Sequence, residues 1–138
     1  MTTIAYKDNR IACDSQATTN GMAVKATKFV KTKNHIYFVS GALADGFKFI
    51  EWLLSDKESE HPKFKADVIE FNRKTGEVFV YEGTDCGVMS EGKFEAWGSG
   101  AQIAMGAMAA GADCETAVKI ACDLDTHTGK KVKVFSTK

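Results

Sequence analysis

The first residues of the chain, Met1-Thr2-Thr3-Ile4, hold a potential nucleophile. An initiator Met followed by a small hydroxyl residue is expected to be removed, and its removal would leave Thr2 with a free α-amine beside its hydroxyl. One residue would then supply both a nucleophile and a general base, an established arrangement for nucleophilic catalysis. Many cytosolic proteins begin with Met-Thr and have no such activity. A functional Thr2 therefore requires partner residues elsewhere in the chain.

Asp14 and Lys28 are candidates for such partners. Residues 2–6 and 10–14 have the composition of two short strands joined by a turn, and a hairpin between them would bring Asp14 back toward Thr2. Each residue also has a purely structural interpretation. An Asp at the end of a strand is commonly a turn former, and Lys28 lies in a basic stretch where a lysine is commonly a solvated surface charge.

The composition of the chain narrows the class of protein. The 138 residues suit one domain, 1–138, and 18 basic residues balance 18 acidic ones. This balance predicts neither a nucleic-acid partner nor an anionic membrane surface. No apolar run is long enough to span a bilayer, and no charged start precedes an apolar segment. We therefore expect a cytoplasmic protein with no membrane partner.

The four cysteines do not predict a metal site or a disulfide framework. Cys13, Cys86, Cys114 and Cys122 are scattered, without a C-x-x-C pair or a histidine at ligand spacing. Buried thiols that act as small hydrophobic side chains are the expected interpretation. The sequence therefore predicts no metal and no cofactor.

The order of the predicted elements indicates an α+β fold. Hydrophobic periodicity predicts a helix over 43–54, and Gly98-Ser99-Gly100 precedes a helix of small residues. A second helix follows the N-cap Asp113, with apolar positions Ala117, Ile120, Ala121 and Leu124. The further predicted strands are a hairpin turning at Asn20-Gly21, 35–39, the hairpin 66–71 with 77–81, 88–89 and 94–97 across a turn at 91–93, and 131–135. Strands without regular βα alternation favour antiparallel sheets with outer helices.

Five segments of the chain, taken in sequence order, resemble the proteasome β-subunit and HslV family of N-terminal-nucleophile threonine peptidases. The start, with Thr2-Thr3-Ile4 and Asp14 to Thr18, is similar to HslV, and the segment Ile120 to Gly129 is more similar to a proteasome β-subunit. Lys28-Phe29-Val30, Ser40 to Asp45 and Gly98-Ser99-Gly100 lie between them. The resemblance implies a layered αββα sandwich of the N-terminal nucleophile hydrolase type.

The resemblance also implies roles for individual residues. Thr2 would be the nucleophile, Lys28 its lysine partner and Asp14 the acid that orients the lysine. The backbone N–H of Gly41 would help to form the oxyanion hole. Ser99 and Asp125 would lie near the Thr2 amine, with Thr128 in a supporting position. The implied specificity pocket is formed by small or apolar residues and one threonine, namely Ala17, Thr18, Ala26, Val30 and Val39.

From these roles we expect an endopeptidase that cleaves after apolar residues of peptides or unfolded proteins. The resemblance further implies a homo-oligomeric ring and an ATPase unfoldase as partner. One departure concerns the outer layer. Family members carry two antiparallel helices before the hairpin of 66–81, whereas the charged loop from Lys57 to Lys65 is too short for a second one. One outer-layer helix is therefore predicted to be missing, which leaves the double ring and unfoldase docking open.

Two other functions remain open at this stage. The first is a non-catalytic, proteasome-like interaction or assembly module that retains Met1. The predicted absence of one outer-layer helix favours this module. The peptidase is favoured by the presence of five matching residues, because a binding module does not need them all. These residues are Thr2, Asp14, Lys28, Ser99 and Asp125. The second is an amidase or acylase on the same fold, which the small apolar pocket neither supports nor excludes.

Overall fold

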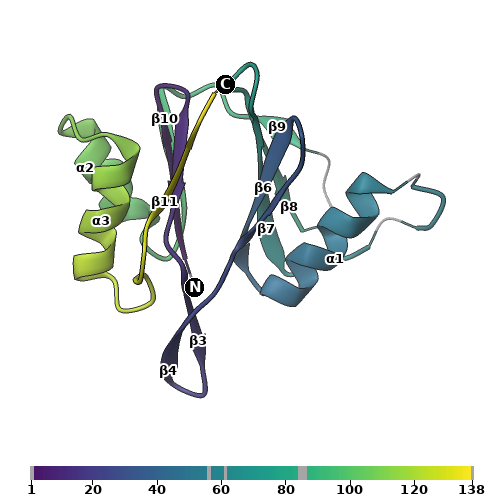
Figure 1. The fold of residues 1–138 in the computed structure, drawn as a ribbon, viewed down its shortest axis with the longest axis horizontal. Helices are drawn as coiled ribbons and strands as arrows, with labels where there is room; N and C mark the ends of the chain where they lie inside the picture. The colour runs from purple at the N-terminus through teal and green to yellow at the C-terminus, as the bar shows by residue number, and fades with distance from the viewer. Residues whose placement is uncertain (1, 56, 61, 84–86, 138) are drawn as a thin grey trace.

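Two antiparallel sheets face each other, with helices on their outer sides (Figure 1). The computed structural model describes residues 2–55, 57–60, 62–83 and 87–137. Within these residues three helices and the antiparallel strands form a mixed α+β fold, as the order of elements predicted. Among the described residues no helix is both long enough and apolar enough to cross a membrane.

The first sheet carries the N-terminal hairpin at its centre. Its order is β10-β1-β2-β11, and the hairpin register pairs Ile4 with Cys13 and Lys7 with Arg10. The predicted hairpin is therefore confirmed, and it returns the chain to residue 14 beside the start of β1. The strands are β1 (Thr3–Lys7), β2 (Arg10–Cys13), β10 (Phe94–Gly98) and β11 (Lys133–Ser136).

The second sheet has the order β5-β6-β7-β8-β9. Its strands are β5 (Phe29–Lys31), β6 (His35–Gly41), β7 (Ala66–Asn72), β8 (Val78–Glu82) and β9 (Val88–Met89). The expectation that 88–89 and 94–97 form two strands across one turn is wrong in its pairing. β9 pairs with β8, whereas β10 pairs with β1 of the other sheet. The turn at 91–93 therefore connects the two sheets. The backbone of β10 forms its hydrogen bonds with β1, from Thr3 to Lys7.

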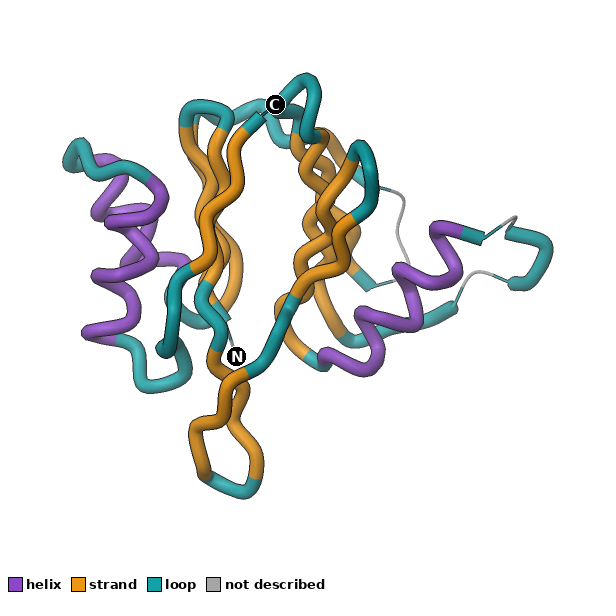
Figure 2. Tube along the Cα trace, viewed as in Figure 1, coloured by secondary structure: helices purple, strands orange, loops and turns teal. Residues whose placement is uncertain are grey.

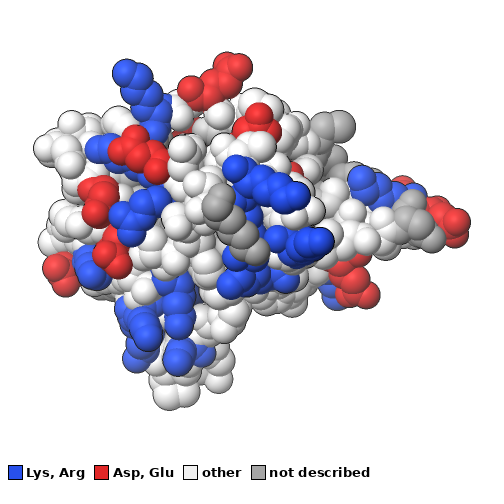
Figure 3. Space-filling model, turned by 45° about the horizontal axis from the view of Figure 1, so that its top comes forward, with Lys and Arg blue, Asp and Glu red and all other residues white. Residues whose placement is uncertain are grey.

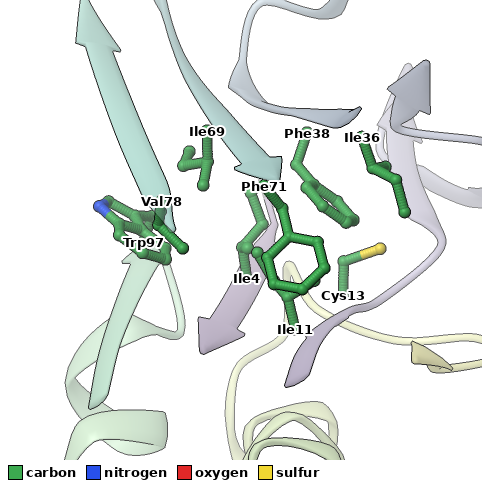
Figure 4. Close-up of a cluster of buried hydrophobic side chains, with 9 residues drawn as sticks. All are labelled: Ile4, Ile11, Cys13, Ile36, Phe38, Ile69, Phe71, Val78 and Trp97. Atoms are coloured by element: carbon green, nitrogen blue, oxygen red, sulfur yellow. The ribbon is translucent and has the colours of Figure 1, made fainter. Parts of the chain in front are cut away.

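The core between the sheets is built from alternate residues of facing strands (Figure 4). On β1 and β2 the inward residues include Ile4 and Ile11, and on β6 and β7 they include Phe38 and Phe71, all fully buried. Burying one such side chain contributes about 1.5–3 kcal/mol. The complete cluster is Ile4, Ile11, Cys13, Ile36, Phe38, Ile69, Phe71, Val78 and Trp97.

Helices α2 (Ala101–Ala109) and α3 (Cys114–Leu124) cover the outer face of the first sheet. The Asp113 side chain accepts a hydrogen bond of 2.8 Å from the Thr116 N–H, which confirms the predicted N-cap. The expected apolar face of α3 needs correction, because Leu124 is 69% exposed. The buried face instead follows the spacing i, i+3, i+4, i+7 through Cys114, Ala117, Val118 and Ala121, and Leu124, the last residue of α3, does not belong to it.

One helix, α1 (Leu43–Leu54), covers the outer face of the second sheet. Phe49 and Ile50 are buried against β6 and β7, and Phe49 stacks on Phe64 with ring centroids 4.2 Å apart. Between α1 and β7, residues 57–60 and 62–65 contain no helix. Within that described part, α1 is the helix that packs on the second sheet.

A short hairpin extends beyond the two sheets. It consists of β3 (Gln16–Thr19) and β4 (Met22–Lys25) and turns at Asn20 and Gly21, both with positive φ. Figure 2 shows it projecting from the end of the sheets where the N-terminus lies. In the space-filling view several basic side chains gather toward this end (Figure 3). Lys25, the last residue of β4, is exposed. The two strands of the hairpin form a separate two-stranded sheet, which lies beside the N-terminus.

Candidate active site

The side chains of Thr2, Asp14 and Lys28 meet at the end of the space between the sheets. The Thr2 hydroxyl donates to Asp14 Oδ1 at 2.5 Å. Lys28 Nζ donates to Thr2 Oγ1 at 2.8 Å and to Asp14 Oδ1 at 3.0 Å. Thr2 directly precedes β1, Asp14 directly follows β2, and Lys28 directly precedes β5. One hydroxyl thus lies between an ammonium and a carboxylate.

Backbone donors hold the Asp14 carboxylate in place. Oδ1 accepts from the Thr3 N–H at 3.1 Å, and Oδ2 accepts from the Gln16 N–H at 3.3 Å and the Gly129 N–H at 3.0 Å. Charge-assisted hydrogen bonds of this kind are stronger than neutral ones. Asp14 therefore makes the Asx-type bond of a turn former to Gln16, and the bonds from Thr3 and Gly129 also fix its carboxylate where it can orient Lys28.

Burial sets the electrostatics of this group. Thr2 and Asp14 are each 1% exposed and Lys28 is 2% exposed, so Lys28 is not a solvated surface charge. Burial lowers the pKa of Lys28 below its ordinary value, although the Coulomb attraction and the hydrogen bond of Asp14 oppose this effect. While it is protonated, Lys28 Nζ can stabilise a developing alkoxide on Thr2 Oγ1, to which it donates a hydrogen bond.

A second hydrogen-bonded group surrounds the backbone of Thr2. Asp125 Oδ2 accepts from the Ser99 and Thr128 hydroxyls, each at 2.6 Å, and Ser99 Oγ donates to the Thr2 carbonyl oxygen at 3.4 Å. Thr128 Oγ1 also lies 2.7 Å from Thr3 Oγ1. Partial burial opposes charge on Asp125, but the hydrogen bonds from Ser99, Thr128 and the backbone lower the pKa of its carboxyl overall. The predicted Ser99 and Asp125 thus join Thr2 through its main chain.

Gly98 lets β10 approach this backbone. A Cβ on Gly98 would collide with the carbonyl oxygen of Thr2, and its φ of +100° is one that residues with side chains rarely adopt. β10 and β1 pair here, with Gly98 opposite Thr3. The glycine therefore allows the end of β10, and with it Ser99, to lie against the nucleophile candidate.

Gly41 borders the space in front of Thr2. It ends β6 with a φ of +103°, and an added Cβ would lie 3.2 Å from Ala66 Cα and Lys65 O. A cavity of about 240 Å³ opens here. Of the predicted substrate-binding residues, Ala17, Thr18 and Val39 line it, while Val30 packs on the apolar cluster around Val39 and half-buried Ala26 does not line it. The full lining is Thr2, Gln16, Ala17, Thr18, Thr19, Lys28, Val39, Gly41 and Leu43.

A second cavity, of about 520 Å³, lies on the other side of Gly41. Ser99 and Gly98 line it from the first sheet, and Ser40, Gly41 and Asp67 line it from the second. Gly41 thus lines both cavities. Together they form a space on two sides of the residue whose N–H was predicted to bind an oxyanion.

The described cysteines are unsuited to act as the nucleophile. Cys13, next to Asp14, is 1% exposed, and burial, with the nearby Asp14 charge, raises the pKa of its thiol to about 12. Burial also raises the pKa of Cys114 and of Cys122 to about 11. Neutral buried thiols are poor nucleophiles. Cys86 lies outside the described residues.

Two contacts of the site went unpredicted. They are the backbone N–H of Gly129 on Asp14, and the hydroxyl pair formed by Thr3 and Thr128. Backbone contacts carry no side-chain signature, so no pattern could have indicated Gly129. Residue type alone also gave no reason to join Thr3 to a residue 125 positions away.

Comparison with known proteins finds likeness at the level of structure. No model of a known protein family matches the chain, and no curated protein matches its sequence. A structure of Thiobacillus denitrificans BPH in complex with epoxomicin is 22% identical, with a TM-score of 0.70 over 99% of this chain and 97% of that one. A structure of BPH without this compound is 21% identical, with a TM-score of 0.68 over the same shares of the two chains. The likeness shows a shared fold.

Proposed function

We propose that the protein is a threonine-type endopeptidase of the N-terminal nucleophile hydrolase kind, with Thr2 as nucleophile. The observation that carries the proposal is the position of Thr2 Oγ1, 2.5 Å from the Asp14 carboxylate and 2.8 Å from the buried Lys28 ammonium. A threonine with no chemical role has no need of two buried charges at its hydroxyl. Thr2 and Lys28 line the first cavity.

In the proposed reaction, Thr2 Oγ1 attacks the peptide carbonyl carbon. The α-amine of Thr2, free after removal of Met1, accepts the hydroxyl proton, and Lys28 stabilises the developing negative charge on Oγ1. The Gly41 N–H donates to the oxyanion of the tetrahedral intermediate. As the C–N bond breaks, the α-amine returns the proton to the leaving amine, and an ester to Thr2 remains. Water then hydrolyses this ester with the α-amine as base.

The layered arrangement and the structural neighbours support this proposal. Helices, two facing sheets and one further helix follow the order of the αββα sandwich proposed from the resemblance (Figure 1). Thiobacillus denitrificans BPH, which shares the fold, has been observed with epoxomicin bound. We propose that the present chain binds this compound in the cavity at Thr2.

The first cavity supports a proposal for the substrate. Its wall combines apolar Val39, Leu43 and Ala17 with the hydroxyl residues Thr18 and Thr19. We propose that it takes a small or apolar side chain on the acyl side of the cleaved bond of a peptide or unfolded protein. Preference for Arg or Asp at that position in a peptide library would contradict this. A homo-oligomeric ring, an ATPase unfoldase as partner and a cytoplasmic location complete the proposal.

A non-catalytic interaction module is the second candidate function. The observation that favours it is the single helix α1 over the second sheet, whose edge strand β9 exposes Val88 and Met89. Such apolar side chains suit contact with another chain. A module of this kind retains Met1, whose amide bond would make the nitrogen of Thr2 unable to act as a base.

Intact mass spectrometry combined with a hydrolysis assay separates the two candidates. Protein purified from its native cell is expected to lack the mass of one Met and to hydrolyse fluorogenic peptides ending in an apolar residue. Retained Met1 together with absent hydrolysis would contradict the peptidase and favour the module. The amidase or acylase alternative predicts a trimmed chain that hydrolyses simple amides but no peptide.

A further inference from the structure

The cavity on the second side of Gly41 contains a carboxylate that the proposed reaction does not use. Asp67 lines this cavity together with Gly41 and Ser99, two residues of the proposed active site. On β7, Ile69 and Phe71 face the core between the sheets, so Asp67, at the same alternate spacing, faces that side too. Its carboxylate therefore lies on the cleft side of the sheet.

Asp67 has no compensating cation among the described residues. Its neighbours across the sheet are Ser40 on β6 and Glu82 on β8, and no ion pair joins it to the exposed Lys65 at the mouth of the same cavity. Carboxylates directly opposite each other on adjacent strands destabilise a sheet. Burial, and secondarily the charge of Glu82, raise the pKa of Asp67. A positive charge brought into the cavity would relieve this unfavourable arrangement.

The position of the cavity assigns it to one half of the substrate. The first cavity is lined by Thr2, Lys28 and Val39, and is proposed to hold the acyl side. The second lies beyond Gly41 and is bordered by Ser99, which donates to the Thr2 carbonyl oxygen. It therefore lies on the main-chain side of Thr2. Since the first cavity is proposed to hold the acyl side, we assign the second cavity to the leaving-group half of the substrate.

We propose that Asp67 determines specificity for the leaving-group half of the substrate by binding a basic side chain there. This inference rests on the proposed peptidase function. Glu82, opposite Asp67 on β8, makes the net charge beside the cavity more negative, and Lys65, which lines the cavity, makes it less negative. An ion pair in a partly solvated cavity predicts a modest preference, about fivefold in kcat/KM for a basic over an isosteric neutral side chain. The preference decreases as salt rises from about 0.05 M to about 0.5 M.

The test uses the full chain with Met1 removed and three internally quenched peptides. The peptides differ only in the first residue after the cleaved bond, which is Lys, norleucine or Glu. We expect the order Lys, norleucine, Glu, and we expect Asp67→Asn to bring the Lys-to-norleucine ratio to about one while hydrolysis of the norleucine peptide continues. Glu51→Gln, at an exposed carboxylate of α1, is the matched control and keeps the ratio.

The outcomes separate this inference from the function on which it rests. Hydrolysis with no Lys preference, or with a preference that survives Asp67→Asn, overturns the role of Asp67 and leaves the peptidase intact. A preference for Glu that disappears in Lys65→Met assigns the cavity to Lys65 and also overturns it. Absence of hydrolysis of all three peptides by the trimmed wild-type chain overturns the peptidase and this inference together.

Discussion

Lys28 Nζ lies 2.8 Å from Thr2 Oγ1, although the two residues are 26 positions apart and belong to segments on different sheets. The lysine is nearly fully buried, and it also donates to Asp14 Oδ1 at 3.0 Å. Removing one member of a buried ion pair leaves the other charge uncompensated. The contact therefore connects the chemistry of Thr2 to the stability of the fold.

Replacing Lys28 tests both consequences. Lys28→Met keeps the length of the side chain but removes its charge, so we expect peptide hydrolysis to fall by about 10²-fold or more. We also expect the free energy of unfolding to fall by about 3 kcal/mol, because Asp14 loses its cation. Chemical denaturation and kcat/KM measure the two effects. Lys25→Met, at an exposed lysine of β4, should change neither, and an equal loss in both variants would contradict the role of Lys28.

The pH dependence of hydrolysis provides a second prediction. Burial lowers the pKa of Lys28, so the ammonium loses its proton below the ordinary lysine value of about 10.4 as pH rises. Activity that requires the ammonium should therefore decline on the alkaline side at a pH below that value. A guanidinium stays protonated over this range. If Lys28→Arg keeps measurable hydrolysis, its loss of activity at alkaline pH should occur at a higher pH than in the wild type. If both proteins lose activity at the same pH, a group other than Lys28 causes the loss.

Asp125 should stabilise the fold in a pH-dependent way. Its hydrogen bonds from Ser99 and Thr128 lower the carboxyl pKa in the folded protein. A carboxyl with a lowered folded pKa contributes stability above its unfolded pKa of about 3.9, and this contribution is lost as pH falls through the folded value. We expect Asp125→Asn to cost about 0.5–1 kcal/mol near neutral pH after allowance for solvent screening. The difference from wild type should shrink below about pH 4. A constant difference at all pH values would argue against this linkage.

Gly98 should tolerate no side chain. Gly98→Ala directs a methyl group at the Thr2 carbonyl oxygen and forces a residue with a Cβ to a φ of +100°. We expect the free energy of unfolding to fall by about 1–3 kcal/mol. We also expect kcat/KM for peptide hydrolysis to fall, because the added methyl group displaces Thr2. Gly106→Ala in α2 is the control, since nothing lies within 4 Å of its added Cβ. It should stabilise the protein by up to about 1 kcal/mol. Equal effects of the two substitutions on Tm would contradict this account.

The sequence was sufficient for most elements and for part of the site. Alternating residues such as Ile4 and Ile11 indicate the N-terminal hairpin, and the hairpin alone places Asp14 near Thr2. Lys28 could not be placed from local pattern, because its position depends on how β5 and β6 face the first sheet. The error over β9 and β10 has the same origin. Alternation predicts a strand but not the sheet that it joins.

Contacts between distant elements limited the prediction of the remaining site. Asp125 reaches Ser99 because α3 packs beside α2, which lies against β10 and β1. The resemblance implied their proximity, whereas periodicity and composition did not. The acid at Asp67 went unpredicted because its importance depends on the cavity beside Gly41. A cavity between two sheets has no signature within either sheet's sequence.

The central claim is that Thr2 Oγ1 is the nucleophile. Its most direct test is peptide hydrolysis by the trimmed wild-type protein, Thr2→Ala and Thr2→Ser, with Tm measured for each. We predict that Thr2→Ala lowers the rate of hydrolysis by about 10³-fold or more. Its Tm should change by only a few degrees. Thr2→Ser should retain part of the activity because it keeps a hydroxyl between Asp14 and Lys28. Hydrolysis by folded Thr2→Ala at the wild-type rate would contradict the account.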